Sequence, residues 1–66
     1  MTVSVNNQSY TLVSNSSIEQ LLTQLEIESN GIAVAINNQI KIKNNWSNTL
    51  LQDGDEVTII KATQGG

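Results

Sequence analysis

The chain has 66 residues and a net charge of −3, from six Asp and Glu against three Lys. A chain this short cannot divide its apolar surface between two cores, so we expect one domain. Cys and His are absent, which excludes disulfides, metal sites built on thiolate or imidazole, and catalysis by either side chain. The acidic balance argues against nucleic-acid binding, and no signal peptide or membrane-spanning run of ~20 apolar residues is found. We therefore expect a cytoplasmic protein with neither a nucleic-acid nor a membrane partner.

Residues 2–13 alternate between apolar and polar side chains, as a half-buried strand does. Val3 and Val5 would share one face of the first strand, and Tyr10 and Leu12 one face of the second. Between them lies the polar run Asn6-Asn7-Gln8, in which Asn tolerates the left-handed conformation of a tight turn. This pattern predicts a β-hairpin.

The apolar spacing then changes to that of a surface helix, with Ile18, Leu21, Leu22 and Leu25 on one stripe. Ser16 with Glu19, or Ser17 with Gln20, would form a capping box at the start. Asn30-Gly31 would end the helix, because Gly reaches positive φ without steric cost. The pattern predicts a helix over 17–28.

Alternation returns over 32–36, and Asn37-Asn38 offers a turn into a short strand over 39–42. Residues 44–51 are irregular, with one short helical turn expected; the apolar anchors of this segment would be Trp46, Leu50 and Leu51. The pattern therefore predicts a second β-hairpin followed by a connecting segment.

Asp53-Gly54-Asp55 is a turn signal that would lead into a last strand over 57–61, with Val57 and Ile59 facing inward. Residues 62–66 contain no large apolar side chain, so we expect a flexible tail there. Residues 1–61 would form the folded domain.

These elements predict an α+β fold in which a mixed sheet of four or five strands packs on one helix, the β-grasp arrangement. A helix with one apolar stripe is stable only when that stripe covers another element. The predicted core consists of Val3, Val5, Leu12, Leu21, Leu22, Leu25, Val34, Ile36, Leu50, Val57 and Ile59.

Three groups of residues suggest chemistry but have simpler explanations. The carboxylates at 53–56 could bind a cation, yet they are too few for a calcium loop and suit a turn. Trp46 could stack on a ligand but is better explained by packing at the edge of a small core. Lys41 and Lys43 would protect a sheet edge from pairing with another chain, rather than bind phosphate.

The pair Gly65-Gly66 has no such explanation, because it follows the last strand and closes no turn. Glycines let an extended peptide enter a narrow channel, so a terminal carboxylate could reach a bound nucleotide. Conversion to an acyl-adenylate would make this carboxylate electrophilic, and a sulfur donor could then replace AMP to leave a thiocarboxylate. Such a chain needs no catalytic side chain of its own.

Several segments together are similar to a known family: 18–22, 33–37, Ile40, Trp46, Leu51, 53–55 and Gly65-Gly66. Over essentially its whole length the chain resembles the ubiquitin-like sulfur carrier proteins, most closely the ThiS family of thiamine biosynthesis. The resemblance implies a ubiquitin-like β-grasp fold and a carrier rather than an enzyme. It also implies that the chain binds no cofactor itself.

The resemblance further implies that Gly66 is adenylated with ATP by an E1-like enzyme of the ThiF type. Sulfur from cysteine would arrive through a desulfurase, and thiazole synthase, ThiG, would receive it. Gly65 and Gln64 would thread into the partners' active sites.

Ile60 should face away from the core and, with Lys61, contact the partners, while the free chain is expected to be a monomer.

Three alternatives stay open on the sequence. The small subunit of molybdopterin synthase has the same tail and chemistry but usually a longer chain. A protein modifier would join Gly66 to lysines through an isopeptide bond. In a plain β-grasp binding module the tail would have no function.

Overall fold

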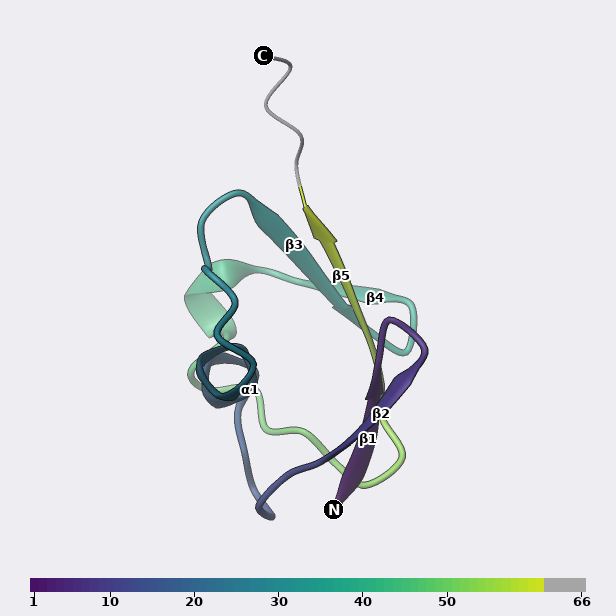
Figure 1. Cartoon of the computed structure of the whole chain (residues 1–66). Coiled ribbons are helices and arrows are strands. Elements are labelled where there is room, and N and C mark those ends of the chain that lie inside the picture. The colour runs from purple at the N-terminus through teal and green to yellow at the C-terminus, as the bar shows by residue number, and fades with distance from the viewer. Residues whose placement is uncertain (62–66) are drawn as a thin grey trace.

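A computed structural model of the chain describes residues 1–61, which form one mixed five-stranded sheet with a helix on one face (Figure 1). The strands lie in the order β2 (Gln8–Thr11), β1 (Thr2–Val5), β5 (Glu56–Lys61), β3 (Ile32–Ile36) and β4 (Gln39–Lys41). The helix α1 (Ile18–Gln24) follows the first hairpin, and a short 3-10 helix, η1 (Lys43–Asn45), follows β4. This is the predicted β-grasp arrangement.

Both predicted hairpins are confirmed, and each turns on a pair of asparagines. Asn6 and Asn7 have φ of 50° and 69°, and Asn37 and Asn38 have the same two values. Positive φ at both central residues defines the type I′ turn, whose twist matches that of the flanking strands. In each hairpin the alternation of apolar residues and the turn therefore require one and the same pairing of the two strands.

The start of α1 is as expected from the second of the two capping options. Ser17 is the N-cap, and its hydroxyl oxygen accepts a hydrogen bond from the backbone N–H of Gln20 at 3.1 Å. The Gln20 side chain in turn accepts from the Ser17 N–H at 2.8 Å. This reciprocal capping box satisfies two of the free N–H groups at the helix start.

The predicted end of the helix is wrong, because α1 stops at Gln24 rather than near residue 28. Glu26 takes positive φ, 56°, and donates its N–H to the Thr23 carbonyl at 3.1 Å. The Ile27 N–H reaches back to the Leu22 carbonyl at 2.9 Å. These two bonds form a Schellman motif, in which Glu occupies the position that usually carries Gly. Gly31 of the Asn30-Gly31 pair lies five residues after Glu26, so this pair does not cap the helix.

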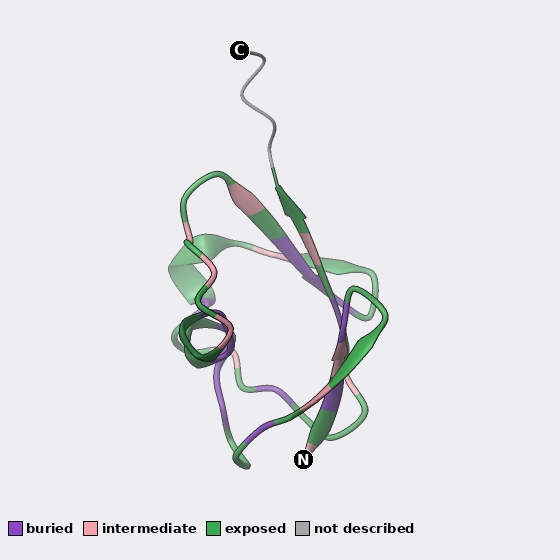
Figure 2. Ribbon diagram, in the orientation of Figure 1, coloured by how far each residue is buried: buried purple, intermediate pink, exposed green. Residues whose placement is uncertain are grey.

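The core lies between α1 and the sheet, where Figure 2 shows buried residues in the strands and in the connections near the helix. Leu25 and Ile59, predicted inside, are half-buried at its margin. The prediction that Leu50 lies in the core is wrong, since its side chain is 53% exposed. The backbone of Leu50 forms a bridge with Ser17, and the next residue, Leu51, points inward instead. The buried core is Val3, Val5, Leu12, Ile18, Leu21, Leu22, Val34, Ile36, Trp46, Leu51 and Val57.

Candidate functional site

The candidate site is the end of β5, from which residues 62–66 continue. Its location is firmly fixed, because β5 lies between β1 and β3 in the middle of the sheet. It pairs with β3 over five residues, up to the partners Ile32 and Lys61, and runs parallel to β1 at its start. Gln64, Gly65 and Gly66 lie outside the described residues, so their predicted roles stay predictions.

Two asparagine side chains extend the pairing of β5 beyond the strand ladders. Asn6 lies just past the end of β1, and its side-chain oxygen accepts from the Ile59 N–H at 2.8 Å while its amide donates to the Ile59 carbonyl at 3.2 Å. Asn37 accepts from the Glu56 N–H at 3.0 Å. Each turn residue therefore also holds β5 in place, a role that the sequence pattern of a turn does not reveal.

Ile60 points away from the helix, as predicted, and is 54% exposed. Ile40 and Ile42 are also exposed, and strand alternation places them on the same outer face. Ala33 lies opposite Ile60, and Ala35 lies opposite Ile40. We call these five residues the outer isoleucine patch. The sequence pointed to Ile40 only as part of the family resemblance and did not point to Ile42, because the pairing of β4 with β3 is needed to see which face these residues occupy.

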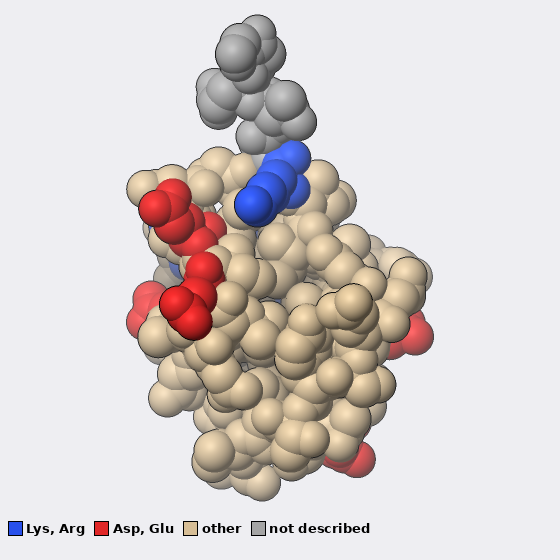
Figure 3. Space-filling model, in the orientation of Figure 1, with Lys and Arg blue, Asp and Glu red and all other residues tan. Residues whose placement is uncertain are grey.

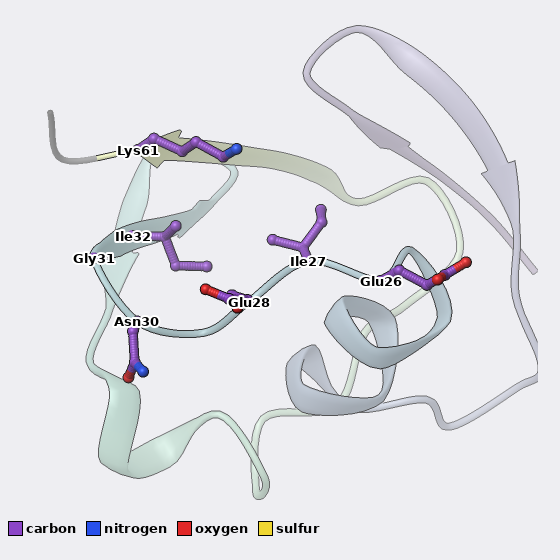
Figure 4. Close-up of a pocket in the computed structure, with 7 residues that line it drawn as sticks. All are labelled: Glu26, Ile27, Glu28, Asn30, Gly31, Ile32 and Lys61. Atoms are coloured by element: carbon purple, nitrogen blue, oxygen red, sulfur yellow. The ribbon is translucent and has the colours of Figure 1, made fainter.

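Lys61 lies on the other side of the sheet, at the edge of a groove of about 540 Å³. In Figure 4 its side chain extends across this groove toward Ile27. The opposite wall is the loop between α1 and β3, with Glu26 and Glu28, and Ile32 at the start of β3 completes the lining. Figure 3 shows the resulting charge pattern on this face, with positive charge at the end of β5 and negative charge on the neighbouring loop.

The loop that follows α1 lines this groove, from Glu26 to Gly31. A second hollow of about 380 Å³ shares Ile27 and Lys61 with the first and reaches Tyr10 and Leu25. The helix-facing side of the sheet is therefore closed over the core and open next to Lys61.

The carboxylate cluster serves the turn before β5. Asp53 accepts a hydrogen bond from the Thr2 N–H at 2.8 Å, and Asp55 accepts from the Gln52 N–H at 2.8 Å. Gly54 has φ of 88°, which suits the glycine that stands there. Within residues 1–61, no group of three or more carboxylates lies close enough to hold a metal ion.

Trp46 packs in the core, as expected. It is 3% exposed, and its indole N–H donates to the Lys41 carbonyl at 2.8 Å. This bond links the edge strand β4 to the connector that follows it, so Trp46 has a structural role. Lys41 and Lys43 lie on and beyond β4, the edge strand of the sheet, as predicted.

Among the described helices, none has the length and apolar character needed to cross a membrane.

Comparison with known proteins agrees with this geometry. Residues 3–66 match the family model described as the ThiS family. The sulfur carrier protein ThiS of Escherichia coli strain K12 is 32% identical over 66 residues, which is all of both chains.

Two solved structures share the fold. The crystal structure of a thiamine biosynthesis protein, ThiS, from Geobacter metallireducens superposes with a TM-score of 0.87, at 23% identity and full coverage of both chains. A solution structure of a thiamine biosynthesis protein from the same organism gives a TM-score of 0.78 at 23% identity, covering all of this chain and 88% of that one. The family match and the full-length relative show that the chain belongs to the ThiS family.

Proposed function

We propose that this chain carries sulfur for thiamine biosynthesis as a thiocarboxylate on Gly66. The observation that carries the proposal is the match to the ThiS family over residues 3–66, which include the terminal glycine pair. This match and the full-length sulfur carrier relative favour a carrier of thiamine biosynthesis over the other readings, namely the small subunit of molybdopterin synthase, a protein modifier and a plain binding module. The chain is thus a carrier protein and not an enzyme.

The proposed chemistry takes place on partner enzymes. The Gly66 carboxylate attacks the α-phosphate of ATP on an E1-like enzyme of the ThiF type, and pyrophosphate leaves. A sulfur donor, supplied from cysteine through a desulfurase, displaces AMP from the acyl-adenylate. The thiocarboxylate then delivers its sulfur to thiazole synthase of the ThiG type. We keep the cytoplasmic location and the monomeric free state as predictions.

In this proposal residues 1–61 are the body that enzymes recognise, and 62–66 are the tail that reacts. Five residues in extended conformation span at most about 17 Å. An enzyme that holds Gly66 in its active site must therefore contact the body close to the end of β5. Pairing with β3 up to Lys61, together with the Asn6 side chain on Ile59, holds that end in a fixed position relative to the body.

The outer isoleucine patch is the docking surface that we propose for these enzymes. Ile60 lies next to Lys61, the last described residue, so the patch is within reach of a tail-bound enzyme. Exposed isoleucines on two strands of a small sheet contribute little to the core, and a grouped apolar surface suits a protein partner. Lys61, on the helix-facing side of the sheet, would add a positive charge at the end of β5 and not within the patch itself.

Mass spectrometry of the loaded chain tests the proposed chemistry. Incubation with ATP, the adenylating enzyme, a desulfurase and cysteine should add about 16 Da, because one carboxylate oxygen becomes sulfur. The chain lacking Gly66 should stay unloaded yet keep the same urea midpoint of unfolding. An unchanged mass of the full chain, under conditions that load a known carrier, would contradict the proposal.

A further inference from the structure

The pair Asn30-Gly31 lies in the loop between α1 and β3, where it does not cap the helix. Both residues are exposed and line the groove beside Lys61. Asn30 is the single asparagine, out of nine in the sequence, that is followed by glycine. Its local chemistry therefore differs from that of every other asparagine in the chain.

An asparagine side chain can be attacked by the backbone nitrogen of the next residue. The Gly31 nitrogen would bond to the Asn30 side-chain carbon Cγ, and the Cγ–Nδ2 bond would break with loss of ammonia. A side chain on the second residue obstructs this ring closure, and Gly31 has none. A Cβ built at Gly31 would meet no atom within 4 Å, so its surroundings are open.

Lys43 supplies a second feature that favours the attack. Its ammonium group donates a hydrogen bond to the Asn30 side-chain oxygen, Oδ1, at 3.1 Å. Negative charge develops on this oxygen while the Gly31 nitrogen adds to Cγ. A positive donor already in place stabilises such a charge, by the same principle as an oxyanion hole. In Figure 4 the Asn30 side chain points away from Lys61, consistent with its contact to Lys43 on the other side of the loop.

We infer that Asn30-Gly31 is a self-modifying site, at which Asn30 deamidates with the help of Lys43. Water then opens the cyclic imide at either of its two carbonyl groups. One product is aspartate, and the other is isoaspartate, in which the main chain runs through the former side chain. Both products replace the neutral amide with a carboxylate and change the net charge of the chain from −3 to −4.

The two products have different structural effects. Aspartate places a carboxylate where Oδ1 now contacts Lys43, so it forms an ion pair without moving the loop. Isoaspartate adds one carbon atom to the main chain between Ser29 and Gly31, within the wall of the groove next to Lys61. Ageing of the chain should therefore reshape the surface beside Lys61.

Peptide mapping by mass spectrometry tests this inference on the full chain, incubated at neutral pH and 37 °C. Asn30 should gain about 1 Da, the difference between an amide and an acid, well before Asn15, which is exposed and followed by Ser16. An isoaspartate methyltransferase should label the same peptide. Equal rates at Asn30 and Asn15 would overturn the inference.

Variants at Lys43 test its part separately from the fold. Lys43→Gln should slow deamidation at Asn30 about two- to fivefold, the size expected for an exposed charged contact. Lys43→Arg keeps the charge and should retain most of the rate, while Asn30→Gln serves as the unreactive control. A Lys43→Gln chain that deamidates as fast as the parent, or faster, would show that Lys43 does not promote the attack.

Discussion

The two faces of the sheet carry similar amino acids but have different consequences for the molecule. On the inner face Val34 and Val57 are at most 2% exposed beneath α1. On the outer face Ile40 in β4 and Ile60 in β5, the strand that also contains Val57, are more than half exposed. Apolar residues on the first face stabilise the fold, whereas those on the second form the docking surface that we propose. Hydrophobicity alone therefore does not tell a core residue from an exposed one in this chain.

The largest expected effect separates the two faces within one strand. Val57→Ala should lower the free energy of unfolding by roughly 2–3 kcal/mol, because it leaves a cavity in a closed core. Ile60→Ala removes more carbon atoms from β5 but should change it by less than about 0.5 kcal/mol, since the side chain is exposed. Urea denaturation of both variants measures the difference. Equal losses would mean that the outer face also supports the fold.

Removal of the Asn6 side chain should have the next largest effect. Asn6→Ala loses two hydrogen bonds to Ile59 and places alanine at positive φ, so we expect a loss of about 2 kcal/mol. Asn7→Gly is the matched control, because glycine keeps the turn and favours positive φ. Urea midpoints check both variants, and an Asn6→Ala chain as stable as Asn7→Gly would contradict the proposed anchoring of β5.

A polar substitution on the outer face should affect partner binding more than stability. Ile60→Ser should raise the KM for adenylation by about tenfold, as expected for loss of a contact of 1–2 kcal/mol, and leave kcat little changed. Val13→Ser is a suitable control, because Val13 is 78% exposed but lies in the connection between β2 and α1. Steady-state kinetics with the adenylating enzyme measures both variants. Equal KM values for the two would show that the outer face is not the docking surface.

The smallest expected effect concerns the end of the helix. Glu26→Gly should stabilise the fold by about 0.5–1 kcal/mol, because glycine adopts the left-handed conformation without the strain imposed on Glu26. Glu28→Gly, in the same loop, controls for general effects of glycine and should bring no gain. Thermal unfolding measures both, and a destabilised Glu26→Gly chain would show that the Glu26 side chain has a role of its own.

Strand periodicity and turn chemistry were sufficient to predict most of the fold. The two Asn-Asn turns and the Ser17-Gln20 capping box each depend on a few neighbouring residues, so they can be recognised locally. The end of α1 could not be predicted, because Glu26 favours a helix on its own and is held at positive φ by the surrounding chain. Leu50 and Leu51 were equally apolar, and the bridge to Ser17 decides which one points inward.

The candidate site could be predicted only in part. Alternation along β5 identified Ile60 as exposed, and this is confirmed. That Ile40 belongs to the same patch as Ile60 follows only from the order of the strands. It can be seen once the pairing of β3 with β4 and with β5 is known. The hydrogen bonds of Asn6 to Ile59 join residues 53 positions apart, so no local pattern could reveal them.

The most direct test of the central claim is the position of the added sulfur within the loaded chain. Fragmentation mass spectrometry should place the gain of about 16 Da on Gly66 alone, with every fragment that lacks this residue unchanged. Sulfur found on any other residue, or spread over several, would contradict the account.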